Sequence, residues 1–346
     1  MTDHTHSASV DRHVASAPRR RFNRSAVLAV AATGGLLGAT ASLRAQEGYP
    51  SRPISMVVPF PPGGVADTVG RPVAEAMGRM LNQSVVVENK AGAGGGIGMA
   101  QVANAKPDGY STLLALCSIA ILPEADRVLN RKPLYQLGDL EPIARITADP
   151  TVLVVRANSP WKTFKEFIDD AKARPGRITF GSSGNYGTMH VPMEMLKQAT
   201  KTYLLHVPYT GAGPAIVGLL GEQVDALATG PATIVQHVKS GRLRALAHWG
   251  TGRLGPLPDV PSIQELGYPV TFSQWAGVFV PSGTPEPVVA KLRDAARKAV
   301  KDERLINAIG TAGSPIQYMD APEFAKFVAE EAKVFQTVVD RIGKQE

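Results

Sequence analysis

The sequence contains one cysteine, Cys117, among 346 residues. A single cysteine excludes an internal disulfide, so cysteine counting gives no information about the compartment. Aromatic residues make up only 6% of the chain, and after residue 45 no basic block carries interleaved aromatic residues. This composition gives no support for nucleic-acid binding. The histidines do not show metal-ligand spacing either, because His190, His206, His237 and His248 are scattered along the chain. We therefore expect no metal site and no cofactor.

The standard nucleotide-binding motifs are also missing. The stretch NKAGAGGGIGM, residues 89–99, has five glycines after a strand-like run. In the pattern G-x-G-x-x-G, however, the third glycine position falls on Ile97 when counted from Gly92, and on Met99 when counted from Gly94. The phosphate loop G-x-x-x-x-G-K-[ST] is absent as well. The stretch is better interpreted as a tight turn that packs a strand against the next helix.

No apolar run after residue 45 is long enough to cross a bilayer, which takes about 20 residues. The N-terminus has the layout of an export signal: basic PRRRFNRS, a short apolar stretch broken by two glycines, and small residues before LRAQ. We expect residues 1–45 to be removed after Ala45, with Ala41 as the alternative, and the mature protein to be periplasmic. The pair Arg19 and Arg20 leaves the general secretory and twin-arginine routes both open. Removal would leave 31 basic and 28 acidic residues, a net charge of +3.

Strand-like apolar runs alternate with helical periods through the rest of the chain, which predicts α/β architecture with parallel sheets. In TFKE, for example, Thr163 and Glu166 form a capping box at the start of a helix. A regular run of strands and helices over residues 150–249 indicates an inner lobe inserted into an outer lobe formed by residues 47–149 and 250–346. The two chain crossings would form a hinge, and ligands of two-lobed proteins bind in the cleft between the lobes.

Two loops between a strand and a helix could hold an anion. VPFPPGGVADT places Gly63 and Gly64 at a helix start, where free amides and the helix dipole attract a carboxylate. TFGSSGNYGT repeats this arrangement in the inner lobe, with a helix starting near Thr188. Either loop alone would be interpreted as a tight turn without a ligand. Together, one in each lobe, they could hold an anionic ligand from both sides of the cleft.

The order and spacing of several segments carry a resemblance to a known family. These segments are YPSRPISMVVPFPPGGVADTVGR, VVVENKAGAGGGIGMAQVANAKPDGY, HVPYTGAGPAIVGLLGEQVDA, LRALA and LPDVPSIQELG. From about Tyr49 to the C-terminus the chain resembles the substrate receptors of tripartite tricarboxylate transporters, also called the Bug family. The resemblance implies a two-lobed periplasmic-binding-protein type II fold, with two doubly wound sheets joined by a two-crossing hinge. It also implies a receptor that holds a small carboxylate largely through backbone amides and waters.

The family motifs match this sequence at specific positions, which become candidate ligand-binding residues. They are Pro61, Gly63, Gly64 and Asp67 in the first loop, Ser182, Ser183, Gly184, Asn185, Thr188 and His190 in the second, then Tyr209, Gly211 and Thr229, with Trp275 near the cleft. Some have structural alternatives: Asp67 as a helix N-terminal acid, His190 as a locally hydrogen-bonded helix residue, and Tyr209 as a packing residue.

Two departures from the family pattern bear on the ligand. The segment VDALATGPAT lacks the acidic residue that many relatives have, which favours a carboxylate without an amino group. The segment LLALCSIAIL is more apolar than usual, so Cys117 and Ser118 could line the pocket. An apolar patch beside carboxylate-binding loops would suit an aromatic or branched acid.

Two other functions remain as alternatives. FGSSGN resembles the turn of a serine hydrolase, but the elbow G-x-S-x-G fails because Asn185 stands two places after Ser183. We therefore predict a binding protein and not an enzyme. The second alternative is a sensing partner that presents its ligand to a membrane kinase instead of to permease subunits. The sequence does not separate these partners, and we expect the receptor itself to be a monomer.

Overall fold

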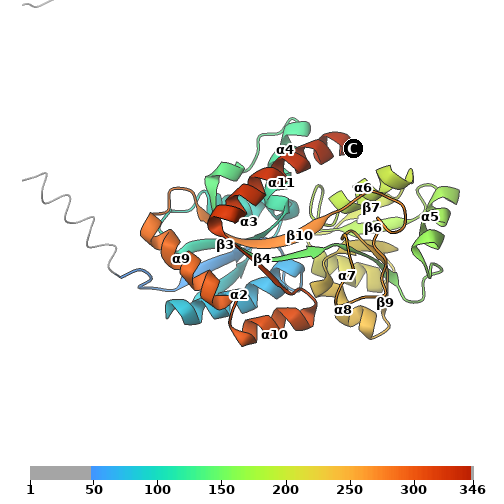
Figure 1. Cartoon of the computed structure of the whole chain (residues 1–346). Coiled ribbons are helices and arrows are strands. Elements are labelled where there is room, and N and C mark those ends of the chain that lie inside the picture. The colour runs from blue at the N-terminus through green and yellow to red at the C-terminus, as the bar shows by residue number, and fades with distance from the viewer. Residues whose placement is uncertain (1–47, 344–346) are drawn as a thin grey trace, which may run out of the picture. The chain divides into compact units, whose positions relative to one another are not determined.

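The computed structural model describes residues 48–343, so the expected export signal lies outside the described residues. The described part contains a six-stranded and a five-stranded sheet, each flanked by helices (Figure 1). This is the α/β architecture with two doubly wound sheets that the sequence predicts. None of the helices within residues 48–343 has the length and apolar character needed to span a membrane.

The first sheet has the strand order β11-β4-β10-β3-β1-β2. β1, β2 and β3 are parallel, whereas β10 runs antiparallel to β3 and β4, and β11 antiparallel to β4. The bounds are β1 Ile54–Val58, β2 Val85–Asn89, β3 Ser111–Leu116, β4 Leu140–Pro150, β10 Ser273–Pro281 and β11 Ile316–Asp320.

Helices cover both faces of the first sheet. In Figure 1, α2, α9 and α10 lie below it, and α3, α4 and α11 above it. The bounds are α2 Val65–Leu81, α3 Gly96–Ala103, α4 Ser118–Val128, α9 Glu286–Ala299, α10 Glu303–Ala312 and α11 Ala321–Ile342, with short 3₁₀ turns η1 Ala93–Gly95 and η2 Leu137–Asp139. Because both faces are covered, the central strands are apolar throughout, as in Leu113 to Leu116 of β3.

The second sheet has the strand order β7-β6-β8-β5-β9. β6 is parallel to β7 and β8, while β5 is antiparallel to β8 and β9. The bounds are β5 Val152–Arg156, β6 Thr179–Ser182, β7 Leu205–Pro208, β8 Ala226–Thr229, β9 Leu243–His248, α5 Phe164–Ala173, α6 Val191–Thr200, α7 Ala212–Leu220 and α8 Pro231–Lys239. The capping box predicted for Thr163 and Glu166 is present at the start of α5.

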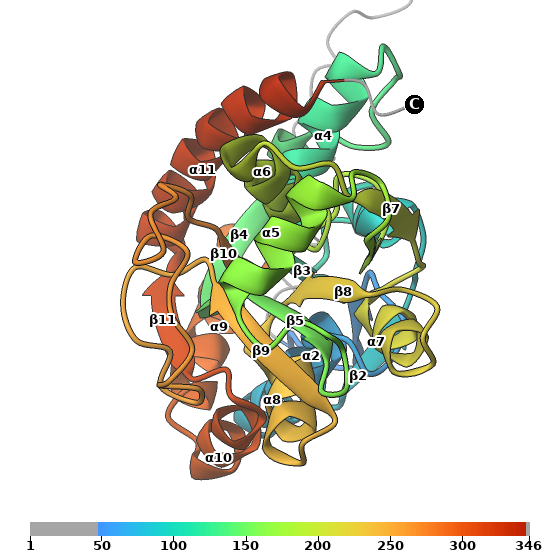
Figure 2. The same cartoon turned by 90° about the vertical axis from the view of Figure 1, so that its right-hand side faces the viewer.

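Two chain segments connect the sheets, one through Thr151 between β4 and β5, and the other between β9 and β10 (Figure 2). The expectation of parallel sheets is wrong, since both sheets are mixed. The physical reason is the crossing itself: β4 leads out of the first sheet and β10 leads back into it, so these neighbours run in opposite directions. The sequence did not predict β4 or α4. For β4 the reason is that its run, LEPIARITADP, mixes charged and apolar residues without clear alternation.

Candidate functional site

The first predicted loop joins β1 to α2. Gly64 is the N-cap of α2, and the first helical hydrogen bond runs from the Thr68 amide to the Gly64 carbonyl at 2.9 Å. The amides of the preceding turn therefore have no partner inside the helix. Gly63 has φ +79°, which favours glycine, and its amide donates to Asp67 Oδ2 at 3.1 Å. The structure thus places a helix start where the sequence predicts it, but the Gly63 amide is bound by Asp67.

Asp67 holds this loop in shape. Its carboxylate accepts from Gly63, from Arg71 Nη2 at 2.8 Å and from Asn89 Nδ2 at 2.9 Å. Asn89 Nδ2 also donates to the Phe60 carbonyl at 2.9 Å. Burial by itself raises the pKa of Asp67, but the hydrogen bonds from Arg71, Asn89 and Gly63 outweigh it, and the pKa lies below its ordinary value. This geometry matches the structural alternative given for Asp67.

Replacement of Asp67 by alanine should destabilise the protein by about 3 kcal/mol, because hydrogen bonds to a buried charge are lost and the Gly63 amide loses its acceptor. The pKa of Asp67 is lower in the folded protein than in the unfolded chain. Its carboxylate therefore contributes to the free energy of unfolding above the ordinary pKa of 3.8, and this contribution is lost as the pH falls through the pKa of the folded state. Urea unfolding at pH 7 measures the loss. Asp169→Ala is the control, because Asp169 forms an exposed ion pair with Lys165, and its replacement should change stability by less than about 0.5 kcal/mol. Equal effects of both variants would contradict the assignment.

The second predicted loop follows β6. Ser182 Oγ lies 2.6 Å from His206 Nε2 and accepts the Gly184 amide at 3.1 Å, and Gly184 has φ +113°. The helix begins at Val191 and not near Thr188 as predicted. The reason is that residues 183–190 form consecutive turns, in which the His190 amide donates to the Gly187 carbonyl.

His190 lies behind this loop in a buried polar cluster. Its Nδ1 accepts the Tyr186 amide at 3.0 Å, and its ring stacks on His206 with centroids 4.1 Å apart. Glu194 lies 3.4 Å from His190 Nε2 and pairs with Lys197 at 2.7 Å. Burial lowers the pKa of His206 to about 3, although the charge of Glu194 acts in the opposite direction. These contacts support the local structural role that was the alternative for His190.

The two loops meet at a small closed cavity of about 10 Å³. Three predicted site residues line it: Gly64, Ser183 and Thr188. The other lining residues are Phe60, Val65, Ala66, Leu116, Ala212 and Gln274. The Ser183 hydroxyl is buried and, within residues 48–343, has no hydrogen-bond partner. A cavity of this size holds about one water, which leaves no room for a bound solute between the two loops.

The sequence analysis missed Gln274, which joins the two lobes across this cavity. Its Nε2 donates to Thr188 Oγ1 at 2.6 Å. The neighbouring Trp275, expected near the cleft, lies on the opposite face of β10 and packs edge-on against Phe324 and Phe327 of α11. Successive strand residues point to opposite faces, so a shift of one position exchanges the cleft residue for a core residue. The alternation of side chains along β10 is the sequence signal that could have placed Gln274, and not Trp275, at the cleft.

The remaining predicted residues lie around the cavity or behind it. Pro61 contacts Gly211, where a Cβ would come within 2.4 Å of the proline ring. Gly184, Asn185 and Tyr209 line a separate pocket of about 460 Å³. Thr229 is buried at the end of β8, and its hydroxyl lies 3.1 Å from that of Thr233.

Cys117 and Ser118 do not line the cavity, contrary to the expectation from the apolar segment. They are buried at the start of α4, and Leu116 contacts the cavity instead. The segment turns into a helix directly after β3, which directs these two side chains into the core. Burial raises the pKa of the Cys117 thiol well above its ordinary value.

The glycine stretch at residues 89–99 forms the turn and helix entry that the sequence predicts, through η1 and α3. It also has a role that the sequence did not reveal. A Cβ on Gly184 would lie 3.1 Å from the Gly94 amide nitrogen, so the stretch packs closely against the second loop from the opposite lobe. Glycine at both positions permits this backbone approach.

Comparisons with known proteins agree with this geometry. The family model described as "Tripartite tricarboxylate transporter family receptor" matches residues 69–344. The chain is 34% identical to protein BugT of Bordetella pertussis over 313 residues, covering 89% of this chain and 96% of BugT.

Two solved structures are similar over nearly their whole length. The periplasmic binding protein BugD has a TM-score of 0.81 at 33% identity, covering 86% of this chain and 100% of BugD. MatC from Rhodopseudomonas palustris with bound malate has a TM-score of 0.78 at 30% identity, covering 84% of this chain and 100% of MatC. On these matches, the chain belongs to the receptor family of tripartite tricarboxylate transporters and is a solute-binding protein of the Bug type.

Proposed function

We propose that the protein is a periplasmic receptor that closes on a small organic carboxylate without an amino group and delivers it for uptake. The observation that carries the proposal is the start of α2, whose amide-bearing residues Gly64, Val65 and Ala66 face Ser183 and Thr188 across the closed cavity. A helix N-terminus attracts a carboxylate through its free amides and its dipole. The bound malate in MatC supports the same ligand class.

The composition of the cavity supports the absence of an amino group. Its lining contains no Asp, Glu, Lys or Arg. A carboxylate would meet the amides of α2, whereas an ammonium group would have no counter-charge and would lose hydration. Phe60, Val65 and Leu116 form apolar walls, which suit an aromatic or branched acid.

Binding requires the lobes to open. A cavity of about 10 Å³ is far smaller than any dicarboxylate. We propose an outer lobe formed by residues 47–149 and 250–346 and an inner lobe formed by residues 150–249, which move about the two crossings. The Gln274–Thr188 hydrogen bond and the Pro61–Gly211 contact would form on closure.

Thermal unfolding of the mature protein with a panel of mono-, di- and tricarboxylates and amino acids tests the proposal. At a hundred times its dissociation constant, a ligand should stabilise the protein by about 2.7 kcal/mol. We expect stabilisation by at least one carboxylate and none by its α-amino analogue. A shift caused by nucleotides and by no carboxylate would contradict the proposal.

The same closed form could serve a membrane sensor kinase instead of permease subunits. Neighbouring genes for permease subunits would favour uptake, and a neighbouring two-component system would favour sensing.

The family consists of receptors and not enzymes, so the hydrolase alternative loses its support. Ester or amide turnover that disappears in Ser183→Ala would restore it.

A further inference from the structure

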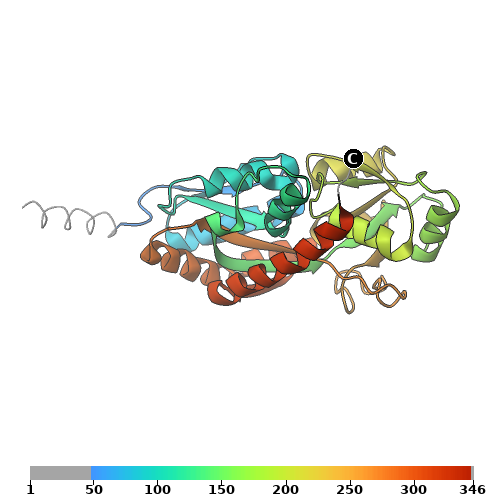
Figure 3. The same cartoon turned by 90° about the horizontal axis from the view of Figure 1, so that it is seen from above.

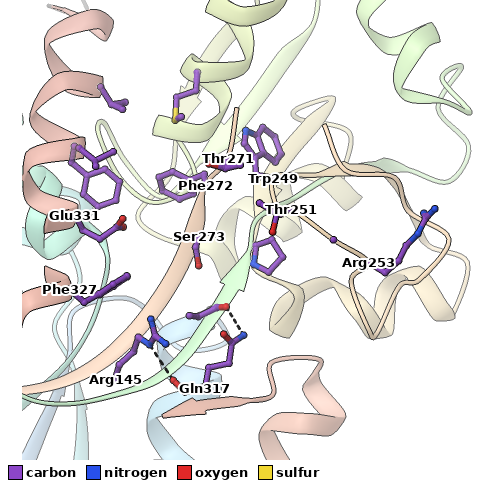
Figure 4. Close-up of a pocket in the computed structure, with 18 residues that line it drawn as sticks. Arg145, Trp249, Thr251, Arg253, Thr271, Phe272, Ser273, Gln317, Phe327 and Glu331 are labelled. Carbon is purple, nitrogen blue, oxygen red and sulfur yellow. Dashed lines mark hydrogen bonds between the residues drawn. The ribbon is translucent and has the colours of Figure 1, made fainter. Parts of the chain in front are cut away.

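Cavities lie on both faces of β10, one of the strands that lead from one sheet to the other. On β10, Gln274 lines the closed cleft cavity, while its neighbour Ser273 lines a larger pocket. Trp275, two positions from Ser273, packs under α11 on the same face as this pocket. The larger pocket therefore lies behind the hinge, opposite the cleft. We call it the back pocket; Figure 4 shows it.

The back pocket has a volume of about 490 Å³, which is in the range of small-molecule sites. Both crossings and α11 contribute to it (Figure 4). From the inner lobe, Met195 of α6 also lines it. Seen from above in Figure 3, α11 and the segment between β9 and β10 lie on the same side of the hinge strands. Aromatic side chains form much of the wall: Trp249, Phe272, Phe327 and Phe335.

Two opposite charges line the pocket without forming an ion pair with each other. Arg145 donates from Nε to the Gln317 carbonyl at 3.2 Å, and its guanidinium lies 4.9 Å from the centroid of Phe327. Among the described residues, no ion pair within 4 Å joins Arg145 to Glu331 or to another acid. Figure 4 shows both side chains directed toward the space between α11 and the crossing strands.

The position of Arg145 depends on a local irregularity. Ala148 and Pro150, two apart on β4, share the face of the back pocket, and regular alternation would turn Arg145 away from it. A register shift between β4 and β10, where Ala276 pairs with Thr147 and Gly277 with Arg145, inserts one extra residue. A β-bulge of this kind redirects the following side chains.

Both charged groups are partly buried in this position. Burial lowers the pKa of Arg145, which Glu331 partly offsets. Burial raises the pKa of Glu331 against the opposing effects of the Trp275 side chain and of Arg145. The buried indole N–H of Trp249 has no hydrogen-bond partner within residues 48–343. A ligand with a carboxylate, an ammonium group and an apolar body would bring an opposite charge to Arg145 and to Glu331 and place its body against the aromatic wall.

We propose that the back pocket is a second ligand site for a small zwitterion with an aromatic body, of the aromatic amino-acid type, and that its occupation favours the closed cleft. Arg145 binds the carboxylate, Glu331 binds the ammonium group, and the aromatic wall holds the ring. A singly charged ligand would leave one of the two protein charges without a partner.

The coupling to closure follows from the position of the pocket. When two lobes close around hinge strands, the surfaces behind the hinge move apart. Opening of the cleft would bring these surfaces together again. A ligand bound between α11 and the crossing segments would therefore oppose opening. The two sites should therefore strengthen each other's ligands by the same factor, at least about fivefold.

Isothermal titration calorimetry of the mature protein with L-phenylalanine tests the site. The matched probes 3-phenylpropionate and phenethylamine each lack one charge and should bind at least about tenfold more weakly. Arg145→Gln and Glu331→Gln should each weaken phenylalanine binding at least about tenfold. Arg304→Gln and Glu330→Gln, at exposed positions, are the matched controls and should leave it unchanged.

The variant Gly64→Val separates this site from the cleft. Phenylalanine binding that is retained in Gly64→Val, weakened only by the loss of the coupling to closure, and that falls further in Arg145→Gln supports the back pocket. Loss of binding in Gly64→Val with retention in Arg145→Gln would assign phenylalanine to the cleft, and no binding at millimolar concentration would also overturn the proposal. The affinity for a cleft carboxylate, measured with and without phenylalanine, tests the coupling, and equal values would contradict it. If the back-pocket proposal fails, carboxylates added without phenylalanine should still stabilise the protein. This failure is therefore distinguishable from failure of the proposed receptor function, on which the back-pocket proposal rests.

Discussion

Gly64→Val should abolish the thermal stabilisation by carboxylates while the protein stays folded. Gly64 has an extended backbone, φ −87° and ψ 174°, which valine adopts readily. A Cβ at this position would meet only ordinary contacts, 3.6 Å from the Ala212 Cβ and 3.8 Å from the Pro61 carbonyl. The γ-carbons of valine would reach further, into the cavity and toward Ala212 of the other lobe. They would block both the approach of a carboxylate to the α2 amides and the closure of the lobes.

A graded series makes this prediction specific. Gly64→Ala adds only the tolerated Cβ and should weaken binding less than Gly64→Val. Valine is a poor N-cap, so we expect a loss of about 1 kcal/mol in the stability of the unliganded protein. Gly255→Val is the control, since a Cβ there meets nothing within 4 Å. Unchanged carboxylate affinity in Gly64→Val, measured by calorimetry, would remove the first loop from the site.

Asp149→Asn should stabilise the protein increasingly as the pH rises from 5 to 8. Asp149 is 2% exposed at the end of β4, and its carboxylate accepts a hydrogen bond from the Ser314 hydroxyl. Burial raises its pKa to about 7, although the bond from Ser314 acts in the opposite direction. The folded protein therefore holds this proton up to about pH 7, whereas the unfolded chain releases it near 3.8.

The sign of the pH effect follows from linkage. Between these two pKa values the unfolded state has lost the proton that the folded state keeps, so Asp149 lowers the stability as the pH rises. Asparagine does not titrate and keeps an acceptor for Ser314. The stability of Asp149→Asn relative to the unsubstituted protein should thus rise by about 3 kcal/mol from pH 5 to pH 8.

Urea unfolding of both proteins across this pH range measures the difference, in which the titration of other groups cancels. Asp259→Asn, at an exposed position, is the control and should give a difference that does not depend on pH. A constant difference for Asp149→Asn as well, or one that falls with increasing pH, would contradict the assignment.

Much of the candidate site could be predicted because it depends on local chain geometry. Gly63 and Gly64 between a strand and a helix predict a helix start at this loop, and in the structure α2 begins directly after its N-cap Gly64. Ser183 and Thr188 were likewise found from the second loop, and they line the cavity. Sequence patterns succeed here because turns and helix starts are decided by neighbouring residues.

The parts that could not be predicted depend on residues distant in the chain. Gln274 faces the cavity because β10 pairs with β4 in one particular register, and a shift of one residue would present Trp275 instead. The roles of Asp67 and His190 depend in the same way on partners outside their loops, such as Asn89 and His206.

The sequence by itself determined the α/β pattern, the two glycine-containing loops and the family to which the chain belongs. These features follow from local periodicity, turn chemistry and the order of motifs. Only the tertiary structure decided the mixed direction of the sheets, the cross-lobe bond between Gln274 and Thr188, and the back pocket between Arg145 and Glu331. The reason is that strand register, a bulge and the two chain crossings bring together residues more than 80 positions apart, and no local pattern encodes such pairings.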